Sequence, residues 1–105
     1  MRTLVFNVKA QRIEKDPACD FKGIVAGSNG YLEAKFNVDA AWRGCRLAAD
    51  FIVGDTPHGV KLEGGLCKIP ADALTGPVVG VRLKGVRRDY AISTNVVYFR
   101  QEVIL

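Results

Sequence analysis

The sequence predicts an all-β domain, an Ig-like antiparallel β-sandwich of about seven to nine short strands with one or two single-turn helices. Three observations lead to this prediction. Apolar and polar residues alternate in nearly every segment, the period expected of strands with one buried face. Turn signals such as 27–30 and 64–65 separate the alternating segments. Helical spacing of apolar residues is scarce, so strands must supply the core.

The alternation is clearest over 31–38. One face carries Leu32, Ala34, Phe36 and Val38, and the other carries Tyr31, Glu33, Lys35 and Asn37. The same pattern recurs over 3–9 and 46–53. A tight turn at Gly64-Gly65 predicts a hairpin. The expected strands are, in chain order, 3–9, 20–25, 31–38, 46–53, 60–63, 66–69, 77–84, 90–93 and 96–103.

Two short helical turns are expected between these strands. Asp39 is placed to cap the first, with its carboxylate accepting from amides near Ala41 and Trp42. Pro70 suits the start of the second, which would run through Leu74 and end at Gly76-Pro77.

Composition indicates one ordinary globular domain spanning 1–105. The chain is 49% hydrophobic and 25% charged, which excludes a disordered segment. No apolar run approaches the roughly 18 residues that span a bilayer, and the N-terminus lacks the continuous apolar stretch of a signal peptide. We therefore expect neither membrane insertion nor secretion by a signal peptide.

The sequence offers no recognisable catalytic, cofactor or metal site. Cys19, Cys45 and Cys67 are an odd number at spacings unlike those of zinc ligands, so we expect reduced thiols in the core. His58 is the single histidine and stands in a Gly/Pro loop beside Asp55, without the further ligands or nucleophile that a reactive site needs. We expect no enzymatic activity and no cofactor.

The net charge of +4 makes the chain mildly basic. Its densest basic stretch comprises Arg82, Lys84, Arg87 and Arg88. Arg82 and Lys84 alternate with apolar residues, so they should share the outer face of a strand. This basic patch lacks a nucleic-acid-binding motif or interleaved aromatic residues, so nucleic acid is not the favoured partner.

Trp42 admits two interpretations. Carried by a short turn between two strands, its ring would close the open end of a sandwich. Alternatively, its ring would stack on a ligand together with Tyr31 and Tyr90. The closing role is favoured because core-directed strands flank the residue on both sides.

The last predicted strand is apolar on both faces, with Val97 and Phe99 on one and Val96 and Tyr98 on the other. Such a strand in a small domain suggests cover by another subunit. Val5 likewise interrupts a polar outer face. The residues expected at subunit contacts are Val5, Val96, Tyr98, Val103 and Leu105.

Several short motifs together resemble a known domain family. They are the segment 31–44 with its Asp39-Ala-Ala-Trp42-Arg-Gly44 turn, Ala49-Asp-Phe51, Cys67-Lys-Ile-Pro70, Val79-Gly80-Val81 and Ser93-Thr94-Asn95. In this combination the chain resembles the N-terminal β-sandwich domain of phage and prophage tail-fibre or baseplate proteins of Gram-positive bacteria. The resemblance covers most of the chain, and its motifs mark strands and turns, without any catalytic residue.

The resemblance implies a non-enzymatic virion structural protein, a component of a tail fibre, baseplate or head decoration. Such a protein would be made in the bacterial cytoplasm and incorporated into the virion. It would act by self-association, with a trimer favoured, and by contacts with other virion proteins. The alternative is a carbohydrate-binding β-sandwich that recognises a cell-surface glycan through Trp42, Tyr31 and Tyr90.

Overall fold

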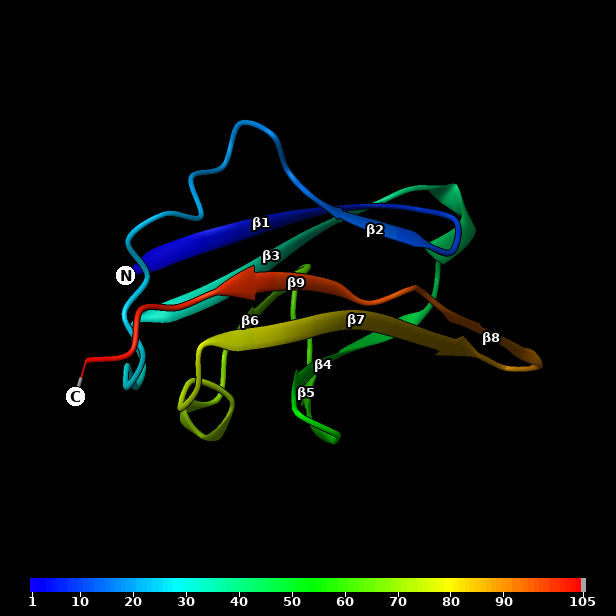
Figure 1. Cartoon of the computed structure of the whole chain (residues 1–105). Coiled ribbons are helices and arrows are strands. Elements are labelled where there is room, and N and C mark those ends of the chain that lie inside the picture. The colour runs from blue at the N-terminus through cyan, green and yellow to red at the C-terminus, as the bar shows by residue number, and fades with distance from the viewer. Residues whose placement is uncertain (105) are drawn as a thin grey trace.

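The computed structural model describes residues 1–104, which form an all-β sandwich with two isolated 3₁₀ turns (Figure 1). The strands of this part of the chain are β1 (Arg2–Lys9), β2 (Arg12–Lys15), β3 (Leu32–Val38), β4 (Arg46–Val53), β5 (Thr56–Lys61), β6 (Leu66–Lys68), β7 (Val78–Arg87), β8 (Tyr90–Ser93) and β9 (Val97–Arg100). The 3₁₀ turns are η1 (Ala40–Trp42) and η2 (Ala71–Ala73). The predicted fold class is therefore confirmed, and both predicted helical turns are present.

One layer, which we call sheet 1, has the strand order β2-β1-β3-β6. Its central pair, β1 and β3, is parallel and in register from Arg2 opposite Leu32 to Val8 opposite Val38. The other pairs of sheet 1 are antiparallel. Parallel neighbours need a long connection between them. The chain between β2 and β3 provides it by returning along the whole sheet before β3 begins.

The second layer, sheet 2, places β4 between β5 and β7, and all its pairings are antiparallel. The free edge of β7 is shared by two strands. Its first half pairs with β9 and its second half with β8. Between these two strands the Thr94 hydroxyl accepts the Leu83 amide at 3.0 Å, and the Asn95 side chain accepts the Ile13 amide at 2.8 Å. Asn95 thereby links sheet 2 to β2 of sheet 1.

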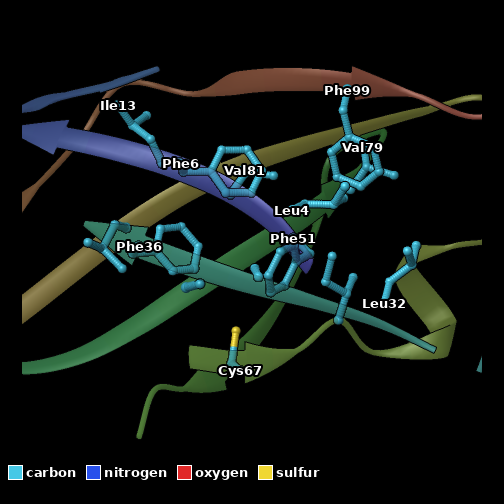
Figure 2. Packing of buried hydrophobic residues seen from close by; sticks show 14 of the residues in the cluster. Leu4, Phe6, Ile13, Leu32, Phe36, Phe51, Cys67, Val79, Val81 and Phe99 are labelled. Atoms are coloured by element: carbon cyan, nitrogen blue, oxygen red, sulfur yellow. The ribbon is translucent and has the colours of Figure 1, made fainter. Parts of the chain in front are cut away.

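The core lies between the sheets and consists of the inward side chains of the alternating strands (Figure 2). Phe6 and Phe36 stack with ring centroids 5.3 Å apart, and Phe51 and Phe99 are buried across from them. Cys67 is buried in this cluster, and loss of hydration together with the charge of Glu33 raises the pKa of its thiol to about 12. The expectation of three core thiols is corrected, because the free thiols of Cys19 and Cys45 are only half-buried.

Several predicted elements differ in the structure. Segment 20–25 is not a strand, although Val25 forms an isolated bridge with Glu102. Its Phe21 ring turns inward against Phe6, at 5.5 Å between centroids, and Arg2 donates to the carbonyls of Asp20 and Lys22. The Phe21 ring packs in the core, and two backbone carbonyls of the segment accept from Arg2 instead of from a neighbouring strand. The segment therefore covers the gap between the two sheets.

The strand boundaries also move. The chain at 12–15, not predicted as a strand, forms β2 because Ile13 pairs with Val8 and joins the core. β5 includes Pro57, which an edge strand tolerates because one side of its backbone has no ladder partner. β9 ends at Arg100, short of the predicted 103.

Candidate functional site

The outer surface of sheet 2 differs in composition from the rest of the molecule, and we call it the basic face. Inward burial of Val79, Val81 and Leu83 turns the alternate residues of β7 outward. The cross-strand register places further outward residues beside them. Within residues 1–104 the charged side chains of this face are Arg46, Lys61, Arg82, Lys84, Arg100 and Asp50. Among the paired strand residues, five cations thus accompany one carboxylate.

Asp50 is the centre of this face and is only 3% exposed. Its Oδ2 accepts from Arg82 Nη2 at 2.7 Å and Nε at 3.1 Å, and lies 3.1 Å from Lys84 Nζ. Gly59 lies directly beside it, where a Cβ would come within 3.3 Å of Oδ1. Burial raises the pKa of the Asp50 carboxyl. The hydrogen bonds and charges of Arg82 and Lys84 outweigh burial, so the pKa is held below its ordinary value.

One end of the basic face is apolar and is built around Gly80. A Cβ on Gly80 would meet Val96 Cγ1 at 3.0 Å, Tyr98 Cε1 at 3.2 Å and Ile52 Cβ at 3.4 Å. The missing side chain lets the Tyr98 ring and Val96 lie across the sheet, an arrangement known to protect a strand glycine. Tyr98 still remains 58% exposed. This end therefore presents an aromatic ring and aliphatic groups to solvent.

A groove of about 760 Å³ lies at the other end of the basic face. It runs between the start of β4, the segment 61–65 and Val86 of β7. Arg46, Lys61 and Glu63 supply its charged groups, while Leu47, Ala48, Leu62 and Val86 supply apolar surface, and the half-buried Cys45 also borders it. Its volume lies in the range of roughly 300–1,000 Å³ typical of ligand sites.

Trp42 packs on the inner side of sheet 2, beneath the end of the basic face that carries the groove. It is 2% exposed, its Nε1 donates to the Ala10 carbonyl at 2.9 Å, and its ring packs where a Cβ on Gly85 would come within 2.9 Å. Asp39 caps η1 by accepting from Ala41 N at 3.2 Å, which holds the turn that carries the ring. The stacking alternative is therefore corrected for Trp42, because both the ring and its N–H are engaged inside the fold.

The two other aromatic residues of the carbohydrate alternative do not form a platform with Trp42. Tyr90 donates its hydroxyl to the Ala41 carbonyl at 2.7 Å, and the Arg87 guanidinium covers its ring at 4.1 Å from the centroid. Tyr31 is exposed, but it precedes β3 beside the start of β1. No two of these rings are presented together to a sugar.

The predicted basic patch is divided by the fold. Arg82 and Lys84 point outward from β7 as expected. Arg87 instead donates to the Arg43 carbonyl at 2.6 Å, and Arg88 occupies the following turn with a φ of 35°. In their place, Arg46 and Lys61 join Arg82 and Lys84, and only the strand pairing brings these four together.

The residues predicted for subunit contacts lie on different surfaces. Val96 and Tyr98 belong to the basic face. Val5 lies on the opposite outer surface, that of sheet 1, where it is half-buried. Val103 is exposed beyond β9, and Leu105 lies outside the described residues.

The single histidine of the chain lies outside the basic face. His58 is half-buried opposite Phe51 in β5. Over the described part of the chain, no group of three or more histidine, cysteine, aspartate or glutamate side chains is placed to hold a metal ion. No helix within residues 1–104 is long and apolar enough to span a membrane.

Comparison of the chain with protein-family models, curated proteins and solved structures found no match. The candidate site is therefore defined by its geometry: a sheet face with an apolar end, a buried ionic centre and a groove rimmed by cations. Such a face suits contact with another macromolecule, because apolar groups supply contact area and charged groups set orientation.

Proposed function

We propose that the protein is a non-enzymatic structural component of a phage or prophage virion, acting in a tail fibre, baseplate or head decoration through self-association and contacts with other virion proteins. The motifs of 31–44, 67–70 and 93–95 support the virion assignment by their resemblance to tail-fibre and baseplate sandwiches. The basic face supports the mode of action.

The observation that carries the proposal is the presence of exposed apolar side chains on a regular sheet face. Tyr98 and Val86 are exposed at the two ends of this face, and Ile52 and Val96 are half-buried between neighbours. Exposed apolar side chains that share one sheet face favour contact with a partner. A partner that covers the face would remove these groups from water. Burial of apolar surface is favourable by about 25 cal/mol for each Å².

Light scattering over a range of protein concentrations tests the proposal. We expect a mass well above the 11.4 kDa of one chain, with three chains as the favoured number. Tyr98→Glu should shift the mass toward one chain, because it places a charge in the contact. Leu66→Glu, a similar change at an exposed residue on the outer surface of sheet 1, should leave the mass unchanged.

A strictly monomeric protein at the highest concentration would contradict self-association. Loss of association in both variants alike would contradict the assignment of the contact to the basic face.

A further inference from the structure

The exposed segment after β9 combines an acidic residue with apolar ones. Its beginning is fixed: Glu102 N donates to the Ile24 carbonyl at 2.7 Å, and the Glu102 carbonyl accepts from Ala26 N at 2.8 Å. Beyond this anchor, Val103 is 44% exposed and Ile104 is 78% exposed, the highest value among the large apolar side chains of residues 1–104. We call Glu102–Ile104 the acidic tail segment.

The groove of the basic face offers the complementary chemistry. Its apolar surface from Leu47, Leu62 and Val86 matches aliphatic side chains, and Arg46 and Lys61 match a carboxylate. Glu63 is the one acidic group that borders the groove, so two cations face one anion there. An apolar segment that carries a negative charge is therefore the chemistry that this groove accepts.

The tail segment and the groove of the same molecule are too far apart to meet. Arg100, at the end of β9, pairs with Val78 at the start of β7, whereas the groove lies at Val86. Eight residues of strand separate these positions by about 27 Å. Val103 and Ile104 extend at most about 7 Å beyond Glu102. Figure 1 shows the same separation, with both termini at one end of the molecule and the β7–β8 turn at the other.

We infer that the acidic tail segment of one copy binds in the groove of a second copy. Val103 and Ile104 cover the apolar floor, and the Glu102 carboxylate is matched by Arg46 and Lys61. The inference rests on the proposed self-association and assigns the groove end of the basic face to it. Because two different surfaces meet, the contact is head-to-tail, so repetition closes a ring or extends a filament. A face-to-face pair would instead bring like-charged basic faces together, which is unfavourable.

The half-buried Cys45 makes the contact measurable in the full-length protein. The rate at which iodoacetamide alkylates Cys45 is followed by mass spectrometry as protein concentration increases. Cys19, which lies beside β1 away from the groove, is the internal control. We expect the Cys45 rate to fall about tenfold at a concentration about one hundred times the dissociation constant, because groove and segment are present in equal amounts and about one groove in ten is then free. The Cys19 rate should stay constant.

Two sets of full-length variants separate this contact from other modes of association. Ile104→Asp changes an exposed residue, so the fold should persist while the concentration dependence of the Cys45 rate is lost. Glu102→Lys and Arg46→Glu should each weaken protection, and their combination should restore it.

The outcomes distinguish the two proposals. Association by light scattering with a constant Cys45 rate, unaffected by Ile104→Asp, would overturn the tail contact and leave self-association standing. A monomer at every concentration with a constant Cys45 rate would overturn both. Protection of Cys45 that Ile104→Asp does not relieve would also overturn the tail contact.

Discussion

The two outer surfaces of the sandwich are both formed by the outward residues of alternating strands, but they use polar residues differently. On sheet 1, polar side chains from neighbouring strands bond to one another near the surface: Thr3 donates to Glu33, and Asn37 donates to Asn7. On sheet 2, the ionic groups converge on one buried carboxylate, and apolar side chains lie on both sides of it. Sheet 1 thus bonds polar side chains in separate pairs beside exposed residues such as Leu66 and Lys35, whereas sheet 2 gathers its ionic groups around Asp50.

The ion pairs of the two surfaces illustrate the difference. Arg12 and Glu14 on β2 lie 3.1 Å apart, with their side chains 71% and 65% exposed. Water screens such a pair, so it contributes little to stability. Asp50 is almost fully buried between Arg82 and Lys84, where the loss of one partner leaves charges without compensation. Ion pairs of similar length therefore contribute differently to the free energy of unfolding, and the buried pair contributes more.

Neutralising one carboxylate on each surface should produce the largest difference in stability between the two surfaces. We expect Asp50→Asn to lower the free energy of unfolding by about 2–3 kcal/mol, because two cations lose a buried charged acceptor. Glu14→Gln, its exposed counterpart, should change this free energy by less than about 0.5 kcal/mol. Urea denaturation followed by Trp42 fluorescence measures both. Equal effects in the two variants would show that burial does not distinguish the surfaces.

Filling the space above Gly80 should have the next largest effect. Gly80→Val places methyl groups against Val96 and Tyr98, and we expect a loss of about 1–2 kcal/mol in the free energy of unfolding from overpacking. Lys35→Val, at an exposed outward position in the middle of sheet 1, should remain within about 0.5 kcal/mol of the parent. Thermal unfolding by circular dichroism compares the two. An unchanged melting temperature for Gly80→Val would show that Tyr98 and Val96 move aside freely.

The pH dependence of stability should also separate the surfaces. The pKa of Asp50 is lower in the folded protein than its ordinary value of 3.8, so its stabilising contribution is complete above that value. The contribution is lost as pH falls through the folded-state pKa, because the unfolded chain binds the proton first. The difference in unfolding free energy between the parent and Asp50→Asn should therefore shrink below about pH 4. A difference that stays constant down to pH 2 would argue against the ionic centre.

The smallest expected difference is in the rates at which the three thiols are alkylated. Cys19 beside sheet 1 and Cys45 at the groove are both half-buried, so both should be alkylated at pH 8 in dilute native protein. Cys67 should react far more slowly, since it is buried and its thiol pKa is raised to about 12. All three should react in urea, as read by mass spectrometry. Rapid labelling of native Cys67 would mean that the sandwich opens at β6.

Local patterns predicted much of this fold. The alternation over 31–38 placed Leu32, Ala34, Phe36 and Val38 inside. The first three are buried, whereas Val38 at the end of β3 is exposed. The capped turn at Asp39 is also present as expected. These features follow from period-two geometry and short-range hydrogen bonds, so a few consecutive residues are enough to specify them.

The pairing of distant strands could not be predicted from such local patterns. Asp50 and Arg82 are 32 positions apart, and only the β4–β7 register reveals that they form an ionic centre. The same register, together with that of β4 and β5, gathers Arg46 and Lys61 onto this face. The predicted patch therefore contained Arg82 and Lys84 but also included Arg87, which the fold turns toward Tyr90.

Local sequence patterns specify the class of fold, the single-turn helices and the inward-facing residues of most strands, because side-chain alternation and turn chemistry act over a few residues. Tertiary structure alone decided the parallel pairing of β1 with β3, the use of Phe21 to close the gap between the sheets, and the composition of the basic face. Those features depend on which distant segments pair, and many registers satisfy the same local alternation. Only the combined packing of both sheets selects one of them.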